Sequence, residues 1–205
     1  MNTRKLYQII TENKGAILEP VYSELLGMVK EELAKEAEKE AGRKPVIRNA
    51  VKQFIRKDLV RPNLTKANVQ EIDGVKYYGY CDGYKLAWSP IDFGFDVADE
   101  SCTLNWRKII EVNYQNRGTI PVTDEFKKEL MLFIKTEAGK PKYLREPFKL
   151  TGENGFVELI NPKYLKVCLD FTGATEIVID LADNTKPLFF HGKDDRHAMC
   201  LPIRR

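Results

Sequence analysis

Several features that would reveal a function at once are absent from this 205-residue chain. No stretch approaches the run of about 18 apolar residues that a membrane-spanning helix needs, and the start of the chain lacks the apolar segment of a secretion signal. The four cysteines are widely spaced, without a Cys-x-x-Cys pair, which argues against a disulfide framework or a zinc site. We therefore expect a cytoplasmic protein with no membrane partner, no metal and no other cofactor.

Catalytic signatures are missing as well. The sequence contains neither a Gly-x-Ser-x-Gly motif nor a phosphate-binding P-loop. His191 and His197 enclose Asp194 and Asp195, but their five-residue spacing matches no familiar zinc motif, so a surface loop is the better interpretation. We expect the protein not to be an enzyme.

The net charge of the chain is only +3, but it is unevenly distributed. Residues 43–66 contain eight basic side chains against one acid, Asp58, a net charge of +7, while the regions before and after each carry −2. Such a block attracts phosphates, although a solvated helix face has the same composition. The basic residues are Arg43, Lys44, Arg48, Lys52, Arg56, Lys57, Arg61 and Lys66.

Apolar periodicity and capping residues predict five helices. Asn49, Thr123 and Asn161 are typical N-cap residues, and Gly173 is expected to end the last helix. In the third helix the apolar positions share one side, so the basic block becomes a basic helix face. The predicted helices span residues 3–14, 20–42, 49–58, 123–136 and 161–172.

Strand patterns fill much of the remaining sequence. Asp73-Gly74 and Asp82-Gly83 are hairpin signals, residues 140–160 show a β pattern around a turn at 152–155, and three strands are expected after Gly173. Residues 91–121 look irregular, with a short apolar run at 106–112. The fold class is α+β, an antiparallel sheet with a few covering helices.

Two segments resemble the bacterial DNA polymerase III β subunit, the sliding clamp. In residues 49–89 a helix precedes an Arg-Pro-x-Leu strand, a hairpin and the letters CDGYKLA at 81–87, which are similar to the Thr-Asp-Gly-x-Arg-Leu-Ala turn of clamp domains. Residues 156–205 resemble the closing half of the last clamp domain, with an Asn-x-x-Tyr-Leu helix, a Pro-Leu strand and a final LPIR similar to Met-Pro-Met-Arg. Together the matches cover roughly 90 residues.

The resemblance implies a DNA-clamp-like domain with two helices on one face of an antiparallel sheet. We place a helical extension at residues 1–45 and the clamp-like domain at 46–205, with an insertion at about 90–155. This division is favoured because 49–89 and 156–205 each supply one helix and the strands after it. A second division pairs the helix at 123–136 with the C-terminal half and leaves 49–89 as a remnant of a preceding domain.

The resemblance also implies two sites. Clamps line a ring with basic helices that hold duplex DNA by its backbone, which here predicts DNA contacts at Arg48, Lys52, Arg56, Lys57, Lys163 and Lys166. Clamps also capture linear motifs of polymerases and clamp loaders in an apolar groove, and the matching residues are Cys81, Leu86, Leu201, Pro202, Ile203 and Arg204. Cys81 stands where the family has Thr, which lowers the polarity of that corner.

Our leading hypothesis is a sliding-clamp-like replication accessory protein, encoded by a phage or mobile element, that binds duplex DNA non-specifically. One domain cannot surround a duplex, so ring formation would require a homo-oligomer. The alternative is a protein-interaction module on a clamp fold that has lost DNA encirclement. In a single-domain protein the two halves of the groove could meet only across a protomer boundary.

Overall fold

The computed structural model describes Val21, Leu25 and Met28 singly, and residues 46–55, 61–99, 103–152 and 155–204. The chain divides into two compact units, Met1–Val46 and Ile47–Arg205. In the first unit Val21, Leu25 and Met28 are helical, as the sequence predicts. The rest of the two N-terminal helices lies outside the described residues.

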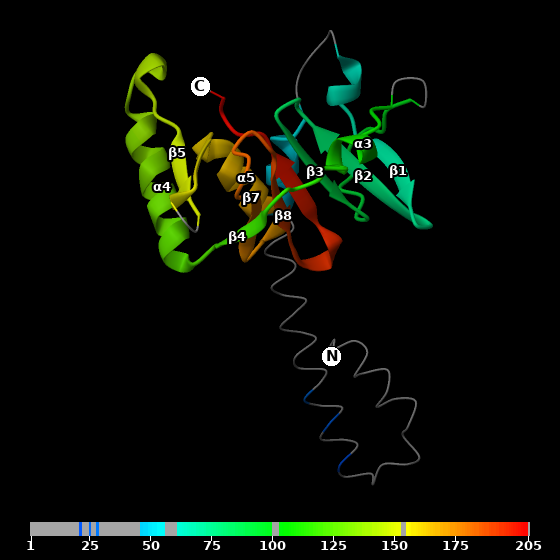
Figure 1. Cartoon of the computed structure of the whole chain (residues 1–205). Helices are drawn as coiled ribbons and strands as arrows, with labels where there is room; N and C mark the ends of the chain where they lie inside the picture. The colour runs from blue at the N-terminus through cyan, green and yellow to red at the C-terminus, as the bar shows by residue number, and fades with distance from the viewer. Residues whose placement is uncertain are drawn as a thin grey trace. The chain divides into compact units, whose positions relative to one another are not determined.

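Seven antiparallel strands form the main sheet of the second unit, in the order β1-β2-β3-β9-β8-β7-β4 (Figure 1). β5 and β6 form a separate hairpin, and both Asp-Gly turns join strands as predicted. The strands are β1 (Asn68–Ile72), β2 (Val75–Cys81), β3 (Lys85–Ser89), β4 (Arg117–Pro121), β5 (Phe148–Thr151), β6 (Val157–Ile160), β7 (Glu176–Asp180), β8 (Leu188–His191) and β9 (His197–Cys200).

The helix termini follow local capping chemistry. The Thr123 hydroxyl accepts a hydrogen bond from the Phe126 amide, the Asn161 side chain accepts one from the Lys163 amide, and Gly173 ends its helix at φ 64°. The prediction for Asn49 is wrong, because residues 46–52 are helical and Asn49 lies inside the helix. The labelled helices are α3 (Arg107–Ile110), α4 (Asp124–Ala138) and α5 (Pro162–Thr172), and the short 3₁₀ turns are η2 (Pro62–Leu64), η4 (Lys142–Leu144) and η6 (Lys193–Asp195).

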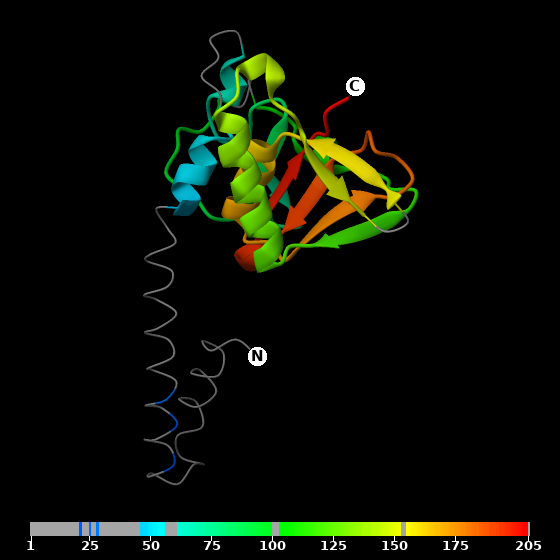
Figure 2. The ribbon, with the colours of Figure 1, turned by 90° about the vertical axis from the view of Figure 1, so that its left-hand side faces the viewer.

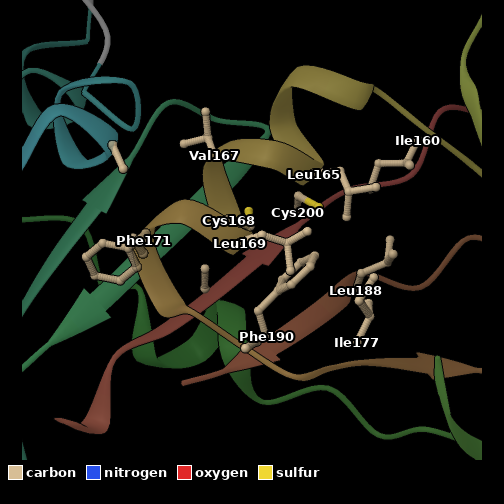
Figure 3. Close-up of a cluster of buried hydrophobic side chains, with 14 of the residues drawn as sticks. Ile160, Leu165, Val167, Cys168, Leu169, Phe171, Ile177, Leu188, Phe190 and Cys200 are labelled. Carbon is tan, nitrogen blue, oxygen red and sulfur yellow. The ribbon is translucent and has the colours of Figure 1, made fainter. Parts of the chain in front are cut away.

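The main core lies between α5 and the sheet. Leu165, Cys168 and Phe171 of α5 are fully buried (Figure 3), and the helix contacts β3, β8 and β9. Burial of each large apolar side chain contributes about 1.5–3 kcal/mol. Phe54 meets Phe171 edge to face at 5.7 Å, and α4 also contacts α5, so these helices share one side of the sheet (Figure 2). The predicted α+β class, an antiparallel sheet with covering helices, is confirmed.

Residues 103–114 cover part of the opposite face of the sheet. Trp106 is completely buried, and its indole N–H donates to the Asn68 carbonyl at 2.8 Å. Gly79 lies directly against the indole, since a Cβ built there would be 2.3 Å from Trp106 Nε1. A segment that looks irregular in the sequence is therefore part of the hydrophobic core.

Residues 90–155 also contribute to the sheet itself. β4 forms one edge of the main sheet by pairing with β7, and α4 contacts α5. This arrangement fits the division that pairs the helix at 123–136 with the C-terminal half, although the domain boundaries stay a prediction. Two segments, within 47–89 and 162–200, each contain one helix followed by three strands. These segments meet where β3 pairs with β9.

Candidate functional site

A largely apolar cavity of about 260 Å³ lies where the turn between β2 and β3 meets the chain after β9. Leu86 comes from β3, Met199 from β9 and Leu201 from the residues that follow it. Arg61 adds a guanidinium group to the lining. We call this cavity the first pocket; its apolar lining consists of Leu64, Cys81, Leu86, Leu104, Ile109, Met199 and Leu201.

The turn beside the first pocket is fixed by its own side chains. One carboxylate oxygen of Asp82 accepts hydrogen bonds from the amides of Tyr84 and Lys85, both at 2.9 Å. The other oxygen pairs with the buried Lys85 ammonium group, which also lies 4.5 Å from the ring centroid of Tyr164 on α5. Gly83 has φ 93°, a conformation that glycine adopts without strain. The turn is therefore held in one geometry before any ligand binds.

The C-terminal residues lie against this turn within a single chain. The Leu201 amide donates to the Tyr84 carbonyl at 2.9 Å, and the Ile203 amide donates to the Leu159 carbonyl at 2.7 Å. Of the six predicted groove residues, Cys81, Leu86 and Leu201 line the first pocket. Ile203 lines a second cavity instead, while Pro202 and Arg204 line neither. The role of all six residues as a partner-binding groove stays a prediction.

Sequence reasoning missed four apolar contributors to the first pocket. Leu104 and Ile109 belong to the segment that looks irregular, and Met199 carries no distinctive motif. The one available signal was the Arg-Pro-x-Leu motif, whose Arg61 and Leu64 both line the pocket. The sequence predicts a strand for this motif, but Pro62–Leu64 form the 3₁₀ turn η2.

Cys81 forms a buried corner of the first pocket. Burial raises the pKa of its thiol above the usual value. The thiol is therefore neutral at physiological pH and behaves as a small apolar group. This agrees with the lower polarity expected from Cys in place of the family's Thr.

Four of the six predicted DNA-contacting residues are described, and they lie on two helical segments. Arg48 and Lys52 are exposed on residues 46–52, and Lys163 is exposed on α5. Lys166 forms an ion pair with Asp170 one turn along α5, which reduces its free charge. Arg56 and Lys57 lie outside the described residues.

The two histidines lie opposite each other at the ends of β8 and β9, with the η6 turn between these strands. Their Nδ1 atoms are 2.9 Å apart, and His197 Nε2 is 2.6 Å from an Asp195 carboxylate oxygen. Burial lowers the pKa of His191, with the nearby His197 adding to this effect. Within the described ranges, no group of three or more His, Cys, Asp or Glu side chains is arranged to hold a metal ion.

Comparison with known proteins identifies the fold. No protein-family model and no curated protein matches the sequence. Among solved structures, the chain is similar to the Helicobacter pylori β clamp bound to a DNA ligase peptide, with a TM-score of 0.55 at 12% identity over 78% of this chain and 63% of that one. It is also similar to the Streptococcus pneumoniae DNA polymerase III β chain, with a TM-score of 0.54 at 10% identity over 80% and 63%.

A third similar structure is the Bartonella birtlesii sliding clamp bound to griselimycin, with a TM-score of 0.56 at 12% identity over 78% of this chain and 63% of that one. The second unit therefore has the fold of a bacterial sliding clamp. The chain spans less than two thirds of the length of these clamps. In the described part of the chain, no helix is long and apolar enough to cross a membrane.

Proposed function

We propose that this protein is a non-enzymatic, clamp-fold accessory protein that captures short apolar peptide segments in the first pocket. The observation that carries the proposal is the meeting of Leu86, Met199 and Leu201 beside a turn held by Asp82 and Lys85. A preorganised apolar pocket binds a flexible peptide at a smaller entropic cost. The Helicobacter pylori clamp, which has the same fold, binds a DNA ligase peptide.

Leu201 is the position at which to test this proposal. Its side chain lines the first pocket and is 39% exposed, so a charged replacement disturbs the pocket more than the core. We expect the wild type to bind the DNA ligase peptide or griselimycin in calorimetric titrations, and Leu201→Glu to weaken binding at least about tenfold, or about 1.4 kcal/mol.

The control for this titration is Leu132→Glu, which places the same charge at a 67% exposed leucine on α4, outside the first pocket. It should bind both probes as the wild type does. Wild-type protein that binds neither probe would contradict the proposal, as would equal affinities of the two variants.

Duplex DNA is the second candidate ligand, and the exposed cations of two neighbouring helical segments support it. Arg48, Lys52 and Lys163 project from segments that contact each other through Phe54 and Phe171. Backbone binding of this kind is independent of sequence and weakens steeply with salt. Encirclement would need several chains, because one chain spans less than two thirds of a clamp subunit.

Charge reversal tests the DNA proposal. We expect Lys52→Glu combined with Lys163→Glu to weaken duplex binding and to lower the slope of log affinity against log salt by about 1–2, as the loss of one or two phosphate contacts would. Lys108→Glu, on the exposed surface of α3, is the matched control and should retain the slope. An unchanged slope in the double variant would show that these helices do not bind the duplex.

A further inference from the structure

A second cavity, of about 540 Å³, lies at the N-terminal end of α5. Its walls come from the end of α4, from residues 142–147, from the start of α5 and from Ile203 near the C-terminus. We call it the second pocket. Of the site residues predicted from the sequence, Lys163 and Ile203 line the second pocket, and it shares no lining residue with the first pocket.

The second pocket has an excess of positive charge. Lys142, Arg145 and Lys163 line it, together with two carboxylates, Glu137 and Glu146. The negative charge of Glu137 is compensated within the chain, because one of its oxygens pairs with Lys140 Nζ at 2.6 Å and the other accepts the Glu146 amide at 2.8 Å. These hydrogen bonds lower the pKa of Glu137, so it stays charged and paired. The exposed ammonium groups of Lys142 and Lys163 therefore favour an anionic ligand.

One cation of the second pocket is held in place by the backbone. The Arg145 side chain donates to the carbonyl of Lys140 at 3.1 Å and to that of Ala138 at 3.4 Å, which also satisfies the end of α4. Its charge is therefore fixed beside the pocket. Lys142 and Lys163 remain the better positions for substitution.

The two pockets lie along the same short stretch of chain. Leu201 lines the first pocket and Ile203 lines the second. Two residues of extended chain span only about 7 Å, and both residues are anchored through their amides, to Tyr84 and to Leu159. A single extended peptide of about seven residues is therefore long enough to reach from one pocket into the other.

We infer that the peptides captured by this protein carry an apolar anchor for the first pocket and, a few residues away, acidic side chains for the second pocket. This inference rests on the proposed function and specifies its ligand. An acidic peptide fits better than a nucleic acid backbone, because the cations adjoin the apolar side chains of Ile134 and Ile203. A row of phosphates has no apolar group to place against these side chains, whereas an acidic residue beside an apolar one matches the mixed lining.

A displayed library of random 12-residue peptides, selected on the full-length protein, tests the inference. We expect an apolar anchor in the selected sequences, with Asp and Glu enriched at least threefold on one side of it. Selection on Lys142→Glu combined with Lys163→Glu should keep the anchor and abolish the acidic enrichment. Lys108→Glu, on α3, should select the same peptides as the wild type.

The outcomes separate the inference from the proposed function. Selected peptides without any apolar anchor would overturn both. An anchor without acidic enrichment would overturn the inference alone. Synthetic peptides give the second readout: the acidic form should bind about fivefold to tenfold more tightly than its Gln/Asn analogue at low salt. Equal affinities would assign the second pocket to another ligand.

Discussion

At the residue scale, Glu158 on β6 is a buried carboxyl group with little compensation among the described residues. Its side chain is 2% exposed, and Oε1 receives no hydrogen bond from the residues that the structure describes. Burial raises the pKa of Glu158 to about 8, and the charges of Asp183 and Asp180 add to the shift. The native state therefore keeps this proton up to about pH 8, whereas the unfolded chain releases it near 4.5.

Glu158 makes the free energy of unfolding fall as pH rises between these two values, because the native state binds the extra proton. We expect the free energy of unfolding of Glu158→Gln, measured with urea, to match that of the wild type at pH 5. At pH 8.5 it should exceed the wild-type value by about 2–4 kcal/mol. Glu129→Gln, at an exposed position on α4, should follow the wild type at both pH values. If the difference in free energy of unfolding between the wild type and Glu158→Gln is the same at both pH values, Glu158 is not protonated in the native state.

At the element scale, the structure depends on a segment without regular secondary structure along most of its length. Trp106 brings residues 103–114 onto the sheet by filling the space above Gly79 and by donating to Asn68. The Leu104 amide donates to the Asn68 side chain at 2.7 Å, and the Arg107 amide donates to that of Gln70 at 3.0 Å. Residues 103–114 are therefore tied to the edge strand β1 through one of its backbone carbonyls and two of its side chains.

Trp106→Ala should therefore remove about 3–5 kcal/mol from the free energy of unfolding, the usual cost of truncating a fully buried tryptophan. Tyr143→Ala, at an 85% exposed aromatic residue on η4, is the matched control and should cost less than about 0.5 kcal/mol. Denaturant unfolding followed by circular dichroism measures both. A small loss for Trp106→Ala would mean that residues 103–114 are not part of the core.

The sequence predicts an element when the residues that determine it lie close together in the chain, and it fails when the element depends on long-range contacts. The caps at Thr123 and Asn161, the stop at Gly173 and the Asp-Gly turns are short-range features, and all are found. β4 was not predicted, because RGTIP is short and contains Gly and Pro, and it becomes a strand only by pairing with β7. The apolar contribution of Leu104 and Ile109 to the first pocket depends on the same kind of long-range contact.

At the scale of the whole molecule, the second unit contains two segments, each with one helix followed by three strands. The two segments are joined where β3 pairs with β9. Because this junction lies within one chain, the 81–86 turn and Leu201 form a continuous surface without a second protomer. The resemblance in sequence predicted the residue types of this site. It left open whether they would meet within one chain, because that depends on strand pairing across more than 100 residues.

The central claim is that partner peptides bind in the first pocket. The most direct test is a nuclear magnetic resonance titration of the isotope-labelled full chain with the DNA ligase peptide that the Helicobacter pylori clamp binds. We predict that the amide signals with the largest shifts belong to residues 81–86, 199–201 and 203. Shifts confined to the helical residues 46–52 and to the solvent side of α5, or no shifts at saturating peptide, would contradict it.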